Sequence, residues 1–214
     1  MITVYVFGNA PPPVREVTRD LRVLWALEES GLPYRLRRLD FAAGELKGPD
    51  YMRIHPFGQI PAIDDEGFTL FESAAIVLYL AEKAGTLLPE SREGRALATQ
   101  WALAAVNTVE PAIVELFTAD AFSAEEDWAV ERRPALVERV KMRLAALEGE
   151  LAQRPYLLGD AFSAPDILMA TVLRIVRQPE LLAAVPNVAA YLARCEARPA
   201  WGKVLAEHRQ RLAA

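Results

Sequence analysis

The sequence is poor in the residues that form disulfides and metal sites. Cys195 is its only cysteine, and His55 and His208 are its only histidines. A single cysteine cannot form an internal disulfide, which suits a reducing compartment, so we expect a cytoplasmic protein. The two histidines lie far apart in the sequence, which argues against a metal site built on clustered His and Cys ligands. We therefore expect no metal.

Positive charge and long hydrophobic runs are scarce as well. The formal net charge is −5 over 214 residues, which argues against a nucleic-acid partner because phosphates require a basic surface. No apolar run approaches the length of a membrane span, and Met1 leads directly into a strand-like segment, so we expect neither a membrane partner nor a signal peptide. The composition, 52% hydrophobic and 25% charged, is that of a globular protein. The chain is long enough for one large domain or two small ones.

Residues 1–85 alternate between strand-like and helix-like segments. Residues 2–7 are rich in β-branched and aromatic side chains and predict a strand, and 18–30 predict a helix that ends at Gly31. A second strand is expected within 32–41. Two short strands then flank turn residues, and a helix runs to Gly85. This order predicts a small mixed sheet with helices on its faces, an α/β domain.

The rest of the chain, from about 93 to 214, contains no segment that reads as a strand. It is predicted to be an all-α helical bundle. Its first long helix is expected to kink near Pro111, and Pro134 is expected in the first turn of the next helix. Ser163 and Asp166 have the spacing of a capping box at the start of a later helix.

The stretch from Gln59 to Ser73 places specialised residues at both joints of the short hairpin. Pro61 opens a strand, and a cis bond before it would free the backbone N–H and C=O of Ile60 for a ligand. Ser73 is the expected N-cap of a helix, where free N–H groups attract a carboxylate. Glu72 beside it can accept hydrogen bonds from an ammonium group. Taken singly, a turn proline and a plain cap would explain Pro61 and Ser73, but together these groups match a small zwitterionic peptide.

The segments around these joints resemble the cytosolic glutathione S-transferase family. The family's glutathione-binding segment is similar to PFGQIPAIDDEGFTLFESAAIVLYLAEK, and its first helix and second strand are similar to LRVLWALEESGLPYR. Two later segments, YLLGDAFSAPDILMA and PNVAAYLARCEARPAW, resemble parts of its second domain. The resemblance covers essentially the whole chain. It implies a thioredoxin-like glutathione-binding domain at 1–85 and an all-α helical domain at 93–214.

The resemblance also implies that glutathione is the co-substrate, and it suggests how glutathione is held. Pro61 would be the cis-proline, and Ile60 would be the backbone partner of the cysteinyl unit. Glu72 and Ser73 would hold the γ-glutamyl end, with Gln59 nearby.

The group that stabilises the glutathione thiolate does not follow from the resemblance. Phe7 stands where the family often has a tyrosine, and the usual serine position falls on Val17. Thr18 is the first candidate, and the competing interpretation is a helix N-cap. Arg19 either stabilises the anion by its charge or is simply solvated, and Asn9 is a third candidate through its amide N–H. Without a cysteine nearby, a mechanism using two protein thiols is excluded, and so is the cysteine-dependent branch of the family.

We therefore predict a glutathione transferase that joins the thiol to a small electrophile. Asn107, on the first long helix of the second domain, is the candidate substrate-pocket residue. Two alternatives stay open: a glutathione-dependent disulfide reductase or peroxidase-like enzyme, and a non-catalytic binding protein on the same scaffold. The resemblance further implies a homodimer. Neither the electrophile nor the dimer interface follows from the sequence.

Overall fold

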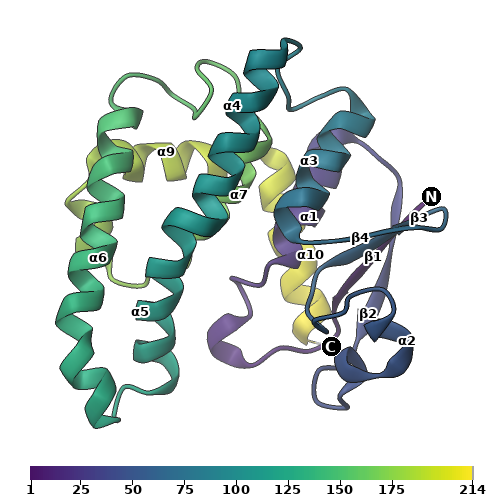
Figure 1. Ribbon diagram of the computed structural model, residues 1–214, viewed down its shortest axis with the longest axis horizontal. Coiled ribbons are helices and arrows are strands. Elements are labelled where there is room, and N and C mark those ends of the chain that lie inside the picture. The colour runs from purple at the N-terminus through teal and green to yellow at the C-terminus, as the bar shows by residue number, and fades with distance from the viewer. Residues whose placement is uncertain (214) are drawn as a thin grey trace. The chain divides into compact units, whose positions relative to one another are not determined.

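The computed structural model describes residues 1–213, which form two compact units. Unit 1 combines Met1–Leu88 with the chain from Arg198 onward, and unit 2 is Pro89–Ala197. Figure 1 follows the chain from the strands of unit 1 through the helices of unit 2 and back to unit 1. The last helix thus groups with the strand-bearing unit, whereas the predicted second domain ran from 93 to 214.

Unit 1 is built on a four-stranded sheet in the order β2-β1-β3-β4. β1 is parallel to β2, and the other neighbouring pairs are antiparallel. The elements of this unit are β1 (Ile2–Phe7), η1 (Pro12–Val14), α1 (Asp20–Ser30), β2 (Tyr34–Leu39), η2 (Glu45–Lys47), α2 (Pro49–Met52), β3 (Ala62–Asp65), β4 (Phe68–Phe71), α3 (Ser73–Ala84) and α10 (Pro199–Ala213). The predicted βαβ unit, hairpin and helix are therefore confirmed.

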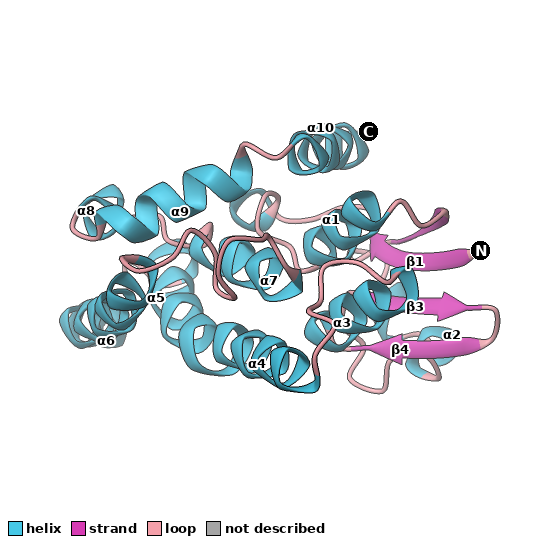
Figure 2. Cartoon of the chain, turned by 90° about the horizontal axis from the view of Figure 1, so that it is seen from above, coloured by secondary structure: helices cyan, strands magenta, loops and turns pink. Residues whose placement is uncertain are grey.

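The two faces of the sheet carry different layers, because successive residues of a strand point to opposite sides. Tyr5 and Phe7 of β1 pack on a buried cluster that includes Leu46 and Tyr51 from the η2–α2 segment. Val6, which lies between Tyr5 and Phe7 in the strand, is fully buried on the other face. Figure 2 shows α1 and α3 together on one side of the strands, and α1 and α3 are packed against each other.

α10 belongs to unit 1 because it packs along α1. The rings of Trp25 on α1 and Trp201 on α10 have centroids 4.7 Å apart. Arg198 donates from Nε and Nη2 to the two carboxylate oxygens of Glu29, at 2.6 and 2.7 Å. A tilted aromatic pair and a bidentate ion pair fix the helix at its N-terminal end.

Asp65 ties the hairpin to α3. Its buried carboxylate accepts hydrogen bonds from Lys83 Nζ at 2.5 Å and from the Tyr79 hydroxyl at 2.6 Å. These two bonds, with that from Lys83 the stronger influence, hold the pKa of Asp65 below its ordinary value.

The Asp65→Asn variant is expected to lose stability at neutral pH. Because the pKa of the carboxyl is lower in the folded state, its contribution is present above the unfolded-state pKa of about 4 and disappears as the pH falls through the folded-state value. Urea unfolding at several pH values should therefore show that the wild type has a larger free energy of unfolding than the variant at neutral pH. This difference should shrink as the pH falls. Asp64→Asn, at the neighbouring position of β3, serves as the control. If the loss of unfolding free energy in Asp65→Asn does not change with pH, the ionised carboxylate of Asp65 does not stabilise the fold as proposed.

Unit 2 is helical throughout the part of the chain that the structure describes, apart from one isolated bridge between Tyr156 and Gly159. The predicted helical bundle is confirmed. Its elements are α4 (Arg92–Leu103), the π-helical segment η3 (Ala104–Val109), α5 (Glu110–Phe122), α6 (Asp127–Leu151), α7 (Ala164–Leu173), α8 (Pro179–Ala183) and α9 (Pro186–Glu196).

The first long helix of unit 2 runs without a break from Arg92 to Phe122. The irregularity expected at Pro111 is a π-helical segment, Ala104–Val109, which ends just before the proline. By length and composition this helix could cross a membrane, a feature that the sequence analysis overlooked, but 50% of its most apolar window is buried inside the protein. Such burial is usual for a core helix.

Candidate functional site

The predicted glutathione-binding residues gather at one end of the sheet in unit 1. Ala62 pairs with Phe71 across β3 and β4, so Pro61 and Glu72, the next residues outward, lie at the same end. β1 runs antiparallel to β3, so its last residue, Phe7, lies at this end of the sheet as well. The loop that follows β1 and leads into α1 therefore starts at the same end of the sheet.

The backbone before β3 has the shape that a peptide ligand requires. The Ile60–Pro61 peptide bond is cis. Within residues 1–213, Ile60 takes part in no backbone hydrogen bond. Its side chain is buried in the cluster that also contains Leu46 and Tyr51. The N–H and C=O of Ile60 are thus available to an extended peptide backbone. The preceding residue, Gln59, is fixed through its carbonyl, which accepts a 2.6 Å hydrogen bond from the Tyr51 hydroxyl.

At the start of α3 the predicted boundary was wrong by one residue. Glu72, not Ser73, is the N-cap, and Ser73 is the first residue of the helix. Glu72 has φ 71° and ψ 110°, a left-handed conformation that costs a non-glycine residue free energy. Its side chain is exposed, while Ser73 is 5% exposed. Strain of this kind clusters at ligand sites, because the surroundings must hold the residue in place.

A buried arginine, Arg22 of α1, orients the Ser73 hydroxyl. Arg22 is 2% exposed and donates from Nη1 to Ser73 Oγ at 3.0 Å. A guanidinium has only donors, so Ser73 Oγ must be the acceptor in this bond. Ser73 therefore keeps its own hydroxyl proton to donate to a different acceptor. The sequence analysis missed Arg22, although a lone charge inside the apolar run LRVLWAL is the signal that could have found it.

Thr18 does not cap α1. The N-cap is Arg19, which forms no side-chain capping bond, so the N-cap interpretation of Thr18 is wrong. Thr18 is 7% exposed, and its Oγ1 lies 3.4 Å from Nε2 of His208 on α10. Arg19 is exposed.

The contacts of His208 determine which of its ring nitrogens carries the hydrogen. Arg211 Nη2 lies 2.6 Å from Nδ1 and 2.9 Å from the Asp20 carboxylate. Because the guanidinium can only donate, Nδ1 accepts and the hydrogen sits on Nε2, which contacts the carbonyl oxygen of Arg15. Burial lowers the pKa of His208 and keeps the ring neutral. Nε2 therefore cannot accept the hydroxyl proton of Thr18.

The two asparagines named as candidates have different surroundings. Asn9 Nδ2 donates to Asp40 Oδ1 at 2.7 Å, and Asn9 Oδ1 accepts from the Phe41 N–H at 3.1 Å, so its side chain holds the loop after β2. Only its backbone N–H is left for a role at the thiol. Asn107 is exposed on η3 of unit 2, and no hydrogen bond involves its side chain among the described residues. The side chain of Asn107 is therefore exposed to solvent, and its role in a substrate pocket stays a prediction.

The remaining reactive side chains are far from this arrangement in the chain. Cys195, which forms no disulfide, is buried on α9 of unit 2. In residues 1–213, no group of three or more His, Cys, Asp or Glu side chains is placed to hold a metal ion.

Comparison with known proteins finds relatives that match most of the chain. Residues 14–82 match the model of the glutathione S-transferase N-terminal domain, and 111–199 match that of the C-terminal domain. Glutathione S-transferase 3 of Zea mays is 33% identical over 87% of this chain and 88% of its own length. The disulfide-bond oxidoreductase YfcG of Escherichia coli is 34% identical over 84% of this chain and 86% of its own. A glutathione transferase of Burkholderia graminis, solved with two glutathione molecules bound per subunit, superposes with a TM-score of 0.84 at 32% identity, covering 95% of this chain and 87% of that one.

The chain therefore belongs to the glutathione S-transferase family. Both family domains are present in the expected order, a thioredoxin-like domain followed by an all-helical one, and the predicted fold class is confirmed. The protein is an enzyme of this family, a glutathione S-transferase.

Proposed function

We propose that unit 1 binds glutathione along the end of the sheet described above. The cysteinyl backbone pairs with the N–H and C=O of Ile60 beside Pro61, in the manner of an added strand. The γ-glutamyl carboxylate accepts hydrogen bonds from the Ser73 hydroxyl and the first N–H groups of α3, and the ammonium donates to Glu72. Gln59 lies next to the cysteinyl segment. The observation that carries this proposal is the bond from Arg22 to Ser73 Oγ, which leaves the serine proton free for an anionic ligand.

The proposed donor to the glutathione thiolate is the hydroxyl of Thr18. Its support is the hydrogen on His208 Nε2, since Thr18 can then only accept from that nitrogen and keeps its own proton to donate. Within residues 1–213 the Thr18 hydroxyl has no other side-chain partner. Arg19 is the N-cap of the same helix, where a positive charge favours the anion. The bound thiolate then attacks an electrophilic carbon, a C–S bond forms, and the leaving group departs with the electrons of its former bond.

The Thr18→Val variant tests this assignment. A hydrogen bond to a charged group contributes about 1.5–3 kcal/mol, so removing it is expected to raise the pKa of the bound glutathione thiol by about one unit. The pKa is measured by titrating the ultraviolet absorption of the thiolate in the protein–glutathione complex. Below the new pKa, the rate of conjugation should fall by about the same factor, roughly tenfold.

Thr69→Val is the matched control, because Thr69 is exposed on β4 and, in the part of the chain that the structure describes, takes part in no hydrogen bond outside the sheet. It should leave the thiol pKa unchanged. If Thr18→Val also leaves the pKa unchanged while Arg19→Gln raises it, the thiolate donor is not Thr18. Absence of any glutathione binding to the wild-type protein would overturn the whole proposal.

Glutathione-dependent disulfide reduction is the second candidate function. It is favoured by the similarity to the disulfide-bond oxidoreductase YfcG and by the lack of a protein cysteine in unit 1, since glutathione would itself supply both sulfur atoms. In that reaction the bound thiolate attacks one sulfur of a disulfide, a second glutathione resolves the mixed disulfide, and oxidised glutathione leaves. Assays with 2-hydroxyethyl disulfide and with 1-chloro-2,4-dinitrobenzene, at equal glutathione concentration, distinguish the two activities.

Three further assignments remain proposals. Asn107, exposed on η3, is proposed to contact the small electrophile. A homodimer is proposed from family membership, and analytical ultracentrifugation measures it directly. A cytoplasmic location is proposed because a single cysteine cannot form an internal disulfide.

A further inference from the structure

The C-terminal part of α10 lies against the loop that leads into α1. Nε2 of His208 is 3.4 Å from Thr18 Oγ1, and the same nitrogen contacts the carbonyl oxygen of Arg15. Arg209, the next residue of α10, donates from Nε to Glu16 Oε1 at 2.6 Å. The loop that carries the proposed thiolate donor is therefore held by a helix from the other end of the chain.

A buried ion pair on the far side of the His208 ring joins α10 to α1. Arg211 Nη2 donates to Asp20 Oδ2 at 2.9 Å and to His208 Nδ1 at 2.6 Å. Asp20 and His208 are 0% exposed, and Arg211 is 4% exposed. A buried ion pair adds little net stability, because the cost of desolvating two charges offsets their attraction. Stability alone therefore does not account for this pair.

Arg211 restricts the neutral ring of His208 to one tautomer. Its guanidinium can only donate, so Nδ1 must accept and the ring hydrogen stays on Nε2. Without Arg211, either ring nitrogen could carry the hydrogen. A bare Nε2 would accept the proton of the Thr18 hydroxyl, and Thr18 would then have no proton to offer to a thiolate.

We propose that His208, Arg211 and Asp20 are positioning residues that keep the Thr18 proton available to the glutathione thiolate. Asp20 orients the guanidinium of Arg211, which sets the tautomer of His208. The Nε2–H of His208 then donates to Thr18 Oγ1. A hydroxyl that accepts one hydrogen bond donates the next one more strongly, because bonds in a chain polarise each other. The inference rests on the proposed role of Thr18, through which all three residues act.

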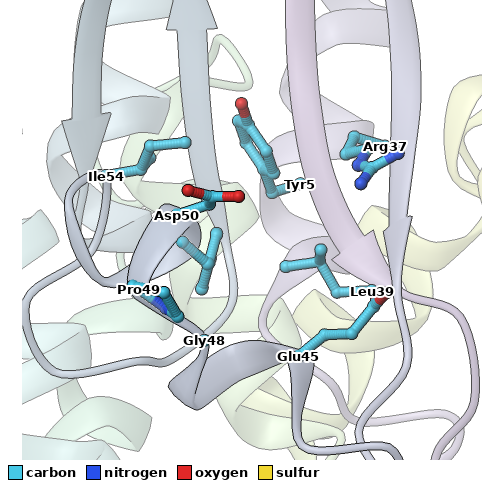
Figure 3. A pocket seen from close by; sticks show the side chains of 9 residues that line it. Tyr5, Arg37, Leu39, Glu45, Gly48, Pro49, Asp50 and Ile54 are labelled. Carbon is cyan, nitrogen blue, oxygen red and sulfur yellow. The ribbon is translucent and has the colours of Figure 1, made fainter.

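A second hydroxyl of unit 1 is independent of α10. Tyr5 of β1 lines a cavity of about 290 Å³ together with Arg37 of β2 and with Pro49 and Asp50 of α2 (Figure 3). Among the described residues of α10, none lines this cavity, and neither does Thr18. Substitutions in α10 should therefore leave the surroundings of the Tyr5 hydroxyl unchanged.

The test measures the pKa of the bound glutathione thiol in variants of the full-length protein, by the ultraviolet absorption of the thiolate. His208→Leu is expected to raise this pKa by about half a unit, because the Thr18 hydroxyl can then turn away from the sulfur. His208→Gln keeps an N–H near the position of Nε2 and should restore most of the wild-type value. Asp20→Asn/Arg211→Met, which removes both charges of the pair, should raise the pKa as His208→Leu does.

The tautomer itself is measured by nuclear magnetic resonance, since the chemical shifts of the ring nitrogens show which of them carries the hydrogen. His55 is the only other histidine, so the signals that disappear in His208→Gln belong to His208. The wild-type ring is expected to carry its hydrogen on Nε2. In Asp20→Asn/Arg211→Met, part of the population should carry it on Nδ1.

Arg209→Gln is the matched control, because it breaks the ion pair between α10 and Glu16 and leaves the contacts of His208 in place. It should keep the wild-type thiol pKa. In a Thr18→Val background, His208→Leu should add no further shift, since its effect passes through the Thr18 hydroxyl.

Four outcomes would overturn the inference while Thr18→Val still raises the thiol pKa. They are an unchanged pKa in His208→Leu, an equal rise in Arg209→Gln, a further rise when His208→Leu is added to Thr18→Val, and a wild-type ring with its hydrogen on Nδ1. If Thr18→Val has no effect and Tyr5→Phe raises the pKa, the proposed donor itself is wrong, and the role of His208 is overturned with it.

Discussion

Replacing Asp166 with alanine is expected to lower the free energy of unfolding by about 3–5 kcal/mol, because it orphans several buried donors at once. The carboxylate is fully buried at the start of α7. It accepts from the backbone N–H groups of Leu157 and Ser163 at 2.9 and 2.8 Å. It also accepts from the hydroxyls of Ser163 at 2.6 Å and Tyr191 at 2.9 Å. Alanine can accept none of these bonds, and the donors have no water to turn to.

Urea unfolding followed by circular dichroism measures this loss. Asp160→Ala is the control, since Asp160 lies in the same loop but is exposed, and its removal should change the free energy by less than about 0.5 kcal/mol. Asp166→Asn keeps one carbonyl acceptor and should fall between the two. A loss for Asp166→Ala no larger than that for Asp160→Ala would show that the capping box does not stabilise unit 2.

Ser73→Ala is expected to weaken glutathione binding by tenfold or more. The alanine cannot donate to the γ-glutamyl carboxylate, and a hydrogen bond to a charged group contributes about 1.5–3 kcal/mol. It also leaves Arg22 without its acceptor on α3. The glutathione dissociation constant is measured by calorimetry. The kcat at saturating glutathione should change less than kcat/KM, because the bond forms in the ground state and persists through the reaction.

Ser91→Ala separates this effect from a general loss of stability. Ser91 is the N-cap of α4 in unit 2 and accepts from the Gly94 N–H, so its loss removes a helix cap without touching unit 1. The control should keep wild-type affinity. Equal glutathione affinity in Ser73→Ala and Ser91→Ala would exclude the N-terminus of α3 as the γ-glutamyl site.

The strands and helices of unit 1 could be predicted because each has a characteristic local sequence pattern. The β-branched and aromatic side chains of 2–7 predicted β1, and turn residues between two short apolar runs predicted the β3–β4 hairpin. Gly85 ends α3 with φ 66°, as a glycine after an apolar helix predicts. The capping box at Ser163 was visible for the same reason, since its two partners are three residues apart.

The first residues of helices were harder to predict where tertiary packing outweighs the conformational preference of a residue. Pro134 was expected at a helix start, but it lies inside α6. The buried stripe of that helix continues on both sides of the proline, with Ala129 before it and Leu136 after it. Burial along this stripe outweighs the hydrogen bond that a proline cannot make. At α3, Glu72 takes a left-handed backbone that its residue type disfavours, so the N-cap could not be placed on it from composition.

What the sequence by itself determined is the family, the order of the elements and the short motif from Gln59 to Ser73. All of these depend on neighbours within a few residues, so pattern and residue type suffice. Only the tertiary structure decided the surroundings of Thr18 and Ser73. The ring of His208 reaches Thr18 across 190 positions of sequence, and Arg22 reaches Ser73 across 51. Buried donors and acceptors must find partners wherever the chain returns, and those partners are set by how α1, α3 and α10 pack together, not by any local pattern.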